Sequence, residues 1–584
     1  MGAFISKSWK TLASAALGIV AFLFWWMKYP SALAFHEQFQ LFQFDGQYFA
    51  ERMAQPGGTA RWLAEFLVQF YNNPLFGAVV LAVLYILIQR LCWALIQRNG
   101  KGAFPLSLAY PLSFIPVLMI WYLMGDTNVM LTFVVAFLLA LVAMCAWPEG
   151  KRAKVAYVGV GLPFVYWLVG PAMLMVALYA ALTLVAERRA KGVALAALVI
   201  LYGVACVLVS VLWAPYPLSR LFRGIDYYRF PLVVSYVMEA AMVVAALLPS
   251  VASWLCRKVR PRTAYVAGLA AMLVALALWL VPSSYDAKTY ELIEYDYLVR
   301  TGQWNAILDK ATKRQPDLPM SVCATDLALG MTNQMGERLF CFFQRGTQGL
   351  LPDFERNFAS TMLTGEAYFQ LGMVNTAQRF AFEAMESLPD YNKSCRAVKR
   401  LAETNLINGQ YEVAEKYLSM LDKTLFYRKW AQRTRQLLGD EQAIDASPVY
   451  GKMRRWSFDG DFLFSDREKD RMIGQLFLRD STNTMAMQYL LAHPLLQGDL
   501  NTFMQYLQVV RHKANYNPSL CQQAVVMAYA RRGETPPEGF VSPQVINDFT
   551  QFSRIVSAEG YNAPALENFR NTFWYYILQN QRQQ

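Results

Sequence analysis

The chain has 584 residues, of which 55% are hydrophobic and only 16% are charged. Soluble globular proteins carry about 25% charged residues, so the composition excludes an ordinary soluble protein. The net charge of +12 lies entirely before residue 283, because the remainder holds 33 basic and 33 acidic side chains. The basic balance therefore belongs to an apolar half, and we expect no nucleic-acid partner.

Apolar runs of about 17 to 25 residues are long enough to cross a bilayer as helices. The N-terminal half contains such runs at residues 11–27, 75–95, 104–124, 129–147, 193–213, 231–255 and 264–281. Residues 155–185 are too long for one ordinary span, and Gly170-Pro171 interrupts them. We interpret this stretch as two short helices. Residues 1–282 are therefore predicted to form a bundle of about nine spans, with external loops at 28–74 and 214–230.

Positive charges between the runs predict the orientation, because Lys and Arg concentrate in short cytoplasmic loops. Basic residues precede the first run and follow every even-numbered one: Lys7, Lys10, Arg90, Arg98, Lys101, Lys151, Arg152, Lys154, Arg188, Arg189, Lys191, Arg257, Lys258, Arg260 and Arg262. We expect a multi-pass protein of a bacterial inner membrane, with a cytoplasmic N-terminus and residues 283–584 in the periplasm. A cleaved signal peptide over residues 1–34 is the alternative, but the bulky Phe-Leu-Phe-Trp-Trp at 22–26 favours a retained anchor.

Glycines recur at a nearly fixed period in the C-terminal half. Gly302, Gly336, Gly372 and Gly409 are separated by 34, 36 and 37 residues, and Gly498 and Gly533 by 35. The segment GEAYFQLGMVNTAQRFAFEAMESLPD places six residues where tetratricopeptide repeats have theirs: Gly365, Tyr368, Gly372, Ala377, Ala384 and Pro389. Residues 283–584 therefore resemble a tetratricopeptide-like α-solenoid, so the whole chain is predicted to be all-α.

Two other groups of residues in this half could support metal or covalent chemistry. Asp459, Asp461 and Asp466 could bind a divalent cation, although the rest of a calcium loop is missing. Cys323, Cys341, Cys395 and Cys521 would face an oxidising compartment, where one or two disulfides could form. His493 and His512 are expected to be structural.

The first external loop carries the first cluster of ionisable groups, namely His36, Glu37, Asp45, Glu51 and Arg52. Its second part, ARWLAEFLVQFYNNP, predicts an amphipathic helix lying in the membrane interface, with Arg61, Glu65 and Gln69 opposite an apolar stripe. Structural explanations are also open, since Asp45-Gly46 is a common turn and Glu51-Arg52 a common surface pair.

The second external loop, APYPLSRLFRGIDYYRFP, collects cations and aromatics on the predicted outer side: Arg220, Arg223, Asp226, Tyr227, Tyr228 and Arg229. Guanidinium groups fit phosphate oxygens, and aromatic rings stack on sugar or lipid groups. The arginines could instead bind anionic lipid headgroups or pair with Asp226. Glu239 is predicted about two turns inside the eighth span, and carboxylates in membranes are usually functional.

This combination resembles the GT-C superfold of polytopic glycosyltransferases, and the first loop is also similar to a family of polytopic envelope proteins from Bacteroidota. The GT-C resemblance implies transfer of a sugar or oligosaccharide from a polyprenyl-phosphate carrier to a protein or glycan, with the repeat domain holding the acceptor. It implies Asp45 or Glu37 as the catalytic carboxylate.

The same resemblance makes Arg220, Arg223 and Arg229 candidates for binding the carrier phosphate. Tyr227, Tyr228, Glu239 and His36 complete the predicted substrate site. No cofactor is established, and a divalent metal stays open. Many members carry a paired Asp-x-Asp in this loop, whereas Asp45 stands eight residues from Glu37, which weakens a metal-dependent mechanism. A non-catalytic envelope-assembly or secretion scaffold and a transporter or flippase using Glu239 are the alternatives.

Overall fold

A computed structural model describes residues 2–99, 109–258, 263–458 and 468–583. These residues form helices and turns, with two isolated bridges and no named strand among them. The chain therefore has the all-helical architecture expected from its sequence. It divides into two compact units. The first unit comprises Met1–Tyr290 with two later segments, Pro389–Cys395 and Lys423–Arg428, and the second unit comprises the rest.

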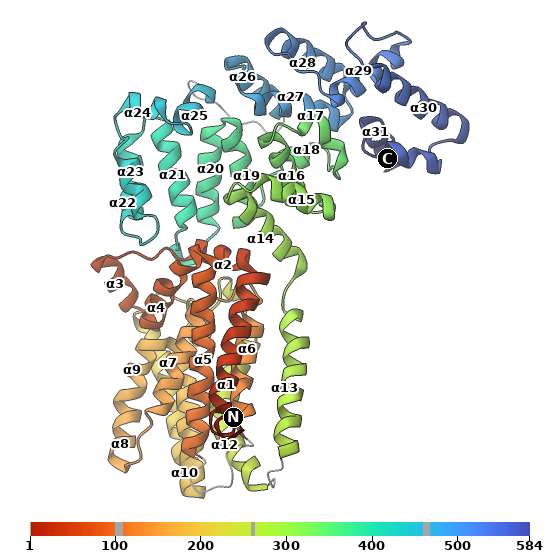
Figure 1. Ribbon diagram of the computed structural model, residues 1–584. Helices are drawn as coiled ribbons and strands as arrows, with labels where there is room; N and C mark the ends of the chain where they lie inside the picture. Colours follow the sequence, from red (N-terminus) through yellow and green to blue (C-terminus); the bar gives the residue numbers. More distant parts are fainter. Residues whose placement is uncertain (1, 100–108, 259–262, 459–467, 584) are drawn as a thin grey trace. The chain divides into compact units, whose positions relative to one another are not determined.

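The first unit is a bundle of long apolar helices joined by short ones (Figure 1). Its elements are α1 (Gly2–Leu23), η1 (Phe24–Lys28), α2 (Pro30–His36), η2 (Glu37–Phe39), α3 (Gly46–Met53), α4 (Gly58–Val68), η3 (Gln69–Asn72), α5 (Pro74–Asn99), η5 (Pro111–Phe114), α6 (Ile115–Leu123), α7 (Leu131–Cys145), α8 (Lys151–Ala156), η6 (Tyr157–Gly161), α9 (Leu162–Val169), η7 (Gly170–Ala172), α10 (Met173–Val209), η8 (Ser210–Leu212), α11 (Leu218–Arg223), η9 (Pro231–Val233), α12 (Val237–Lys258) and α13 (Thr263–Ser283).

Several of these helices are long and apolar enough to cross a membrane, as in a multi-pass membrane protein. By length and hydropathy the candidates among the described residues are Trp9–Lys28, Pro74–Asn99, Lys151–Glu187, Ala190–Leu212, Val237–Leu255 and Ala264–Ser283. Two shorter apolar helices, Pro111–Leu123 and Leu131–Cys145, accompany them. The total of nine crossings stays a prediction.

The stretch Lys151–Glu187 reverses direction part-way. A straight helix of this length would measure about 55 Å, yet Lys154 Nζ lies 2.6 Å from Glu187 Oε1. Gly170, with φ of +66°, interrupts the helix before Pro171. Helix α10 reverses again further along, because a Cβ built on Gly203 would lie 3.3 Å from the Cβ of Ala177. Three successive apolar segments therefore pack against one another.

The second unit consists of short helices that pack mainly as sequential pairs. They are α14 (Ala287–Arg300, which starts in the first unit), α15 (Trp304–Lys313), α16 (Pro319–Met331), α17 (Met335–Arg338), η10 (Leu339–Cys341), α18 (Thr347–Leu350), α19 (Phe358–Leu371), α20 (Val374–Glu386), η11 (Pro389–Tyr391, in the first unit), α21 (Cys395–Ile407), α22 (Tyr411–Asp422), α23 (Arg428–Arg435), α24 (Glu441–Ala446), α25 (Tyr450–Trp456), α26 (Lys469–Arg479), α27 (Thr484–Gln497), α28 (Leu500–Lys513), α29 (Ser519–Arg532), α30 (Pro543–Glu559), η12 (Pro564–Phe569) and α31 (Phe573–Gln583).

The periodic glycines of this unit mostly end helices. Gly372, Gly498 and Gly533 are C-caps in the left-handed region, where glycine carries no steric penalty. Gly365 has a different role, because a Cβ there would lie 3.0 Å from the Cβ of Phe380. It lets α19 and α20 approach closely. Gly336 departs from the pattern, since it lies inside the short helix α17.

The described residues of this half show neither a cluster of metal ligands nor a disulfide between Cys323, Cys341 and Cys521. Asp459, Asp461 and Asp466 lie outside the described residues. No group of three metal-ligating side chains occurs in the part of the chain that the structure describes. Cys323, Cys341 and Cys521 are free thiols. His493 is buried among the helices, and burial lowers its pKa.

Candidate functional site

The polar face of α4 points into the protein. Arg61, Glu65 and Gln69 are buried, whereas Trp62 and Phe66 on the apolar side are only half-buried. The sequence predicted a helix in the membrane interface with these three polar residues opposite its apolar stripe, and it gave no partner for them. Inside a folded protein a buried charge requires partners, and the first and second loops supply them.

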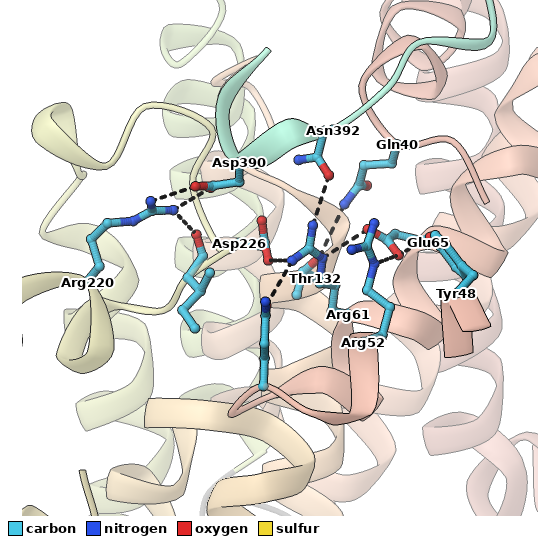
Figure 2. Close-up of polar contacts among 12 residues, drawn as sticks. Gln40, Tyr48, Arg52, Arg61, Glu65, Thr132, Arg220, Asp226, Asp390 and Asn392 are labelled. Atoms are coloured by element: carbon cyan, nitrogen blue, oxygen red, sulfur yellow. Dashed lines mark hydrogen bonds and ion pairs between the residues drawn. The ribbon is translucent and has the colours of Figure 1, made fainter. Parts of the chain in front are cut away.

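Arg61 is the centre of the resulting network (Figure 2). Its Nε lies 3.0 Å from Glu65 Oε1, and its Nη1 lies 2.7 Å from Asp226 Oδ2. Nη1 also donates to Gln55 at 3.2 Å, and Nη2 donates to Asn392 Oδ1 at 2.9 Å. All three guanidinium nitrogens are therefore engaged. The Arg61–Asp226 pair joins the two loops that were predicted to be external, so both loops lie at the same end of the bundle.

Glu65 has two further partners from α3. Arg52 Nε lies 2.8 Å from Glu65 Oε2, and the Tyr48 hydroxyl donates a short hydrogen bond to the same oxygen. The Arg52 guanidinium also lies over the Tyr48 ring, 4.6 Å from its centre. Arg52 thus pairs with Glu65, so the interpretation of Glu51-Arg52 as a surface pair is wrong.

The two carboxylates respond differently to burial. Burial alone would raise the pKa of Glu65, but Arg61, Arg52 and the Tyr48 hydrogen bond hold that pKa below its ordinary value. Burial raises the pKa of Asp226, and the single guanidinium of Arg61 only partly opposes this. Counting Arg52 and Arg61 against Glu65 and Asp226, the cluster is electrically neutral. A neutral, well-satisfied cluster is typical of a structural element.

Arg220 and Arg223 each have a carboxylate partner. Arg220 Nη1 donates to Asp390 Oδ1 at 2.7 Å, and its Nη2 donates to the Ile225 carbonyl at 2.7 Å (Figure 2). Arg223 Nε lies 3.9 Å from Glu239 Oε1, and both side chains are more than one-third exposed. Glu239 is in the first turn of α12, so its predicted depth of two turns is wrong.

The two tyrosines of the second loop fix local backbone. The Tyr227 hydroxyl donates to the Val169 carbonyl and accepts from the Ala172 amide at 3.3 Å, which bridges the Gly170-Pro171 break. The Tyr228 hydroxyl donates to Asp126 Oδ2 at 2.6 Å. Both residues are buried, so these contacts give them a structural role.

Asp45 and Glu37 occupy different surroundings. Asp45 is the N-cap of α3, accepts from the Tyr48 amide at 3.3 Å, and lies 3.0 Å from Lys423 Nζ. The Lys423 hydrogen bond, then the Tyr48 amide, lower the pKa of Asp45. Glu37 is buried and accepts a hydrogen bond from the Tyr427 hydroxyl at 3.2 Å. The solvated carboxylate is thus held in a cap, while the buried one is held by a tyrosine.

Arg229 and His36 form the part of the site with unused hydrogen-bonding capacity. The Arg229 guanidinium carbon lies 3.9 Å from the centre of the Phe39 ring and 5.7 Å from that of Phe35. Its Nε and Nη1 are buried and have no hydrogen-bond partner among the described residues, and the nearby charge of Asp126 acts on Arg229 without forming an ion pair. Nε2 of the buried His36 is likewise unpartnered.

The charge states of these two groups follow from burial. Burial lowers the pKa of Arg229 to about 10, so it stays a cation at neutral pH. Burial and then the charge of Arg229 lower the pKa of His36 to about 4, so the imidazole is neutral. A cation with unsatisfied donors beside a neutral imidazole is a suitable place for an anion.

A family model matches residues 6–580. The chain belongs to the DUF6057 family, which is described as a family of unknown function. No curated protein and no solved structure matches it.

Sequence reasoning placed several of these residues in the right loops but missed the hub of the network in this DUF6057 chain. Arg61 and Glu65 stand four apart on one helical face directly after Gly57-Gly58, which was the available signal. Asp390 and Asn392 carried no signal, because they lie more than 160 positions from their arginine partners.

Proposed function

We propose that the chain is a membrane glycosyltransferase or oligosaccharyltransferase of the GT-C kind, with nine crossings. It would move a sugar from a polyprenyl-phosphate carrier to a protein or glycan on the extracytoplasmic face of a bacterial inner membrane. The observation that carries the proposal is Arg229, a cation that forms no ion pair with any described carboxylate and packs against the segment bearing His36 and Glu37.

Arg229 is the group best suited to the carrier phosphate. Arg220 already makes a bidentate contact with Asp390, and Arg223 is close to Glu239, so binding phosphate there would break existing pairs. Phosphate binding at Arg229 would break no ion pair of the described residues, and the Arg229 side chain is only half-buried, so a phosphate can reach it. A charge-assisted hydrogen bond of this kind contributes about 1.5–3 kcal/mol.

Glu37 is the preferred catalytic carboxylate, and Tyr427 positions it. In the proposed step Glu37 accepts the proton of the acceptor nucleophile as that nucleophile forms a bond to the anomeric carbon. The bond from that carbon to the carrier oxygen breaks, and the leaving polyprenyl phosphate keeps its electron pair beside Arg229. The neutral His36 would then donate a hydrogen bond to a substrate oxygen.

Asp45 fits a catalytic or metal-binding role less well, because its carboxylate caps α3 and pairs with Lys423. A metal-independent mechanism is therefore preferred. The C-terminal helices are proposed to form a tetratricopeptide-like solenoid that binds the acceptor, with the pairing of α19 and α20 through Gly365 as its best-supported unit.

The experiment is complementation of a strain lacking the protein, followed by mass spectrometry of envelope glycans. Glu37→Gln and Arg229→Gln should both lose the glycan species that the wild type restores. Asp45→Asn should retain it, because Asn is also a good N-cap. Well-expressed Glu37→Gln and Arg229→Gln proteins that restore the full profile would remove the proposal.

A scaffold is the second candidate, favoured by one observation. The Arg61 network is charge-balanced and ties segments far apart in sequence, which a purely structural protein also needs. A scaffold predicts that glycans are unaffected by Glu37→Gln, whereas Arg61 variants lose function through instability. No observation favours a transporter that uses Glu239. This residue lies in the first turn of α12 and is more than one-third exposed, so it is not buried inside the helical bundle.

A further inference from the structure

A groove separate from the loop site follows the surface of the membrane-spanning helices. Its first section, about 450 Å³, is lined by α8, η6 and the later part of α10, and its second section, about 310 Å³, continues past α9. Tyr202 lines both sections, and its hydroxyl donates to the Gly159 carbonyl at 2.8 Å. Cavities of this size accommodate small-molecule ligands.

The walls of the groove are regular helical faces. On α10 the lining residues are spaced by three or four positions, from Leu195 through Leu198, Tyr202, Cys206 and Val209 to Trp213 just beyond its end. This distance corresponds to about 27 Å of helix, close to the thickness of a hydrocarbon core. Trp147 lines one end, and Trp167 and Trp213 line the other, as expected at the two interfaces.

Charge occurs at one end only. Lys151 and Lys154 line the section near Trp147, and no Lys or Arg lines the section near Trp167. Lys154 is neutralised by Glu187, whose two carboxylate oxygens both lie 2.6 Å from Nζ. Lys151 is exposed, and no ion pair joins it to a described residue. The groove thus presents one uncompensated cation above a long apolar channel.

We propose that this groove binds an anionic phospholipid, with its phosphate at Lys151 and an acyl chain along the apolar faces of α9 and α10. Charge complementarity selects an anionic headgroup, and the length of the groove, about 27 Å, is more than enough for an acyl chain that crosses one leaflet, about half of the hydrocarbon core. The site is distinct from Arg229, so it does not depend on the proposed transfer reaction.

The test uses the full chain in nanodiscs of phosphatidylcholine with a minor fraction of phosphatidylglycerol. Native mass spectrometry after extraction gives the ratio of the two lipids that remain bound. The wild type should enrich phosphatidylglycerol, and Lys151→Gln should lower the enrichment about fivefold, the loss expected for one lysine at an anionic surface. Arg152→Gln is the control, since Arg152 is also exposed but does not line the groove.

A second pair of variants tests the acyl channel. Leu198 and Leu201 are 62% and 64% exposed on the same helix, but only Leu198 lines the groove. Leu198→Trp should reduce the number of retained lipids, whereas Leu201→Trp should not. A wild type whose retained lipids have the same phosphatidylglycerol fraction as the nanodisc would overturn the proposal. The proposal would also be overturned if Lys151→Gln and Arg152→Gln changed the lipid enrichment equally, or if Leu198→Trp and Leu201→Trp changed the number of retained lipids equally.

Discussion

Replacing Arg61 with Met tests whether the buried network determines the stability of the first unit. The substitution keeps much of the side-chain volume but removes four polar contacts, to Glu65, Asp226, Gln55 and Asn392. Glu65 retains Arg52 and Tyr48, whereas Asp226 loses its ion pair and is left buried. Removing one partner of a buried pair costs about 3–5 kcal/mol, so we expect a loss of this size.

The assay is thermal unfolding in detergent. A thiol-reactive fluorophore detects unfolding, because it reacts with buried cysteines such as Cys92 only when they become exposed. Arg471→Met is the matched control, because Arg471 pairs with Glu468 on the exposed surface, where such pairs contribute about 1 kcal/mol or less. The double variant Arg61→Met, Asp226→Asn should recover part of the loss, since the buried charge is then removed. An Arg61→Met protein as stable as the control variant would refute the reasoning.

Three further predictions concern other parts of the chain. Burial raises the pKa of Asp326 to about 7, so between about pH 4 and 7 the folded state binds a proton that the unfolded state releases. The free energy of unfolding should therefore fall by at most about 4 kcal/mol over this pH range. Asp326→Asn should abolish this pH dependence when unfolding is measured at several pH values. Gly365→Ala should destabilise the α19–α20 pair by about 1–3 kcal/mol in thermal unfolding, because the new Cβ would crowd Phe380. Gly474→Ala is the control: its Cβ would make only ordinary van der Waals contacts, so this variant should be neutral or stabilising. Asp45→Ala should cost about 1 kcal/mol through loss of the α3 cap while Asp45→Asn costs little, and equal losses would contradict the capping role.

The helices of the first unit could be predicted from sequence because apolar runs of bilayer length allow few other structures. The interruption at Gly170-Pro171 was visible for the same reason, since a 31-residue run exceeds one span. In the second unit, positive φ at Gly372 and Gly498 accounts for the glycine period that the sequence displays. Features set by neighbouring residues in the sequence, such as apolar runs and glycine turns, could therefore be predicted.

The candidate site was less predictable because its contacts join distant segments. Periodicity identified the polar face of α4 but could not give the direction in which Arg61 points, since either face of an interfacial helix can be buried. Asp390 and Asn392 lie in a turn after α20, and nothing in their neighbourhood marks them as partners of Arg220 and Arg61. The unsatisfied state of Arg229 likewise becomes visible only when the pairs of the other arginines are known.

The most direct test of the proposed function is the affinity of the purified, reconstituted protein for undecaprenyl phosphate. The account predicts that Arg229→Gln weakens binding about tenfold or more, the loss expected for one charge-assisted contact, while Arg223→Gln leaves it nearly unchanged. Wild-type affinity in the Arg229→Gln protein, or equal losses in the two variants, would contradict the assignment of the carrier phosphate to Arg229.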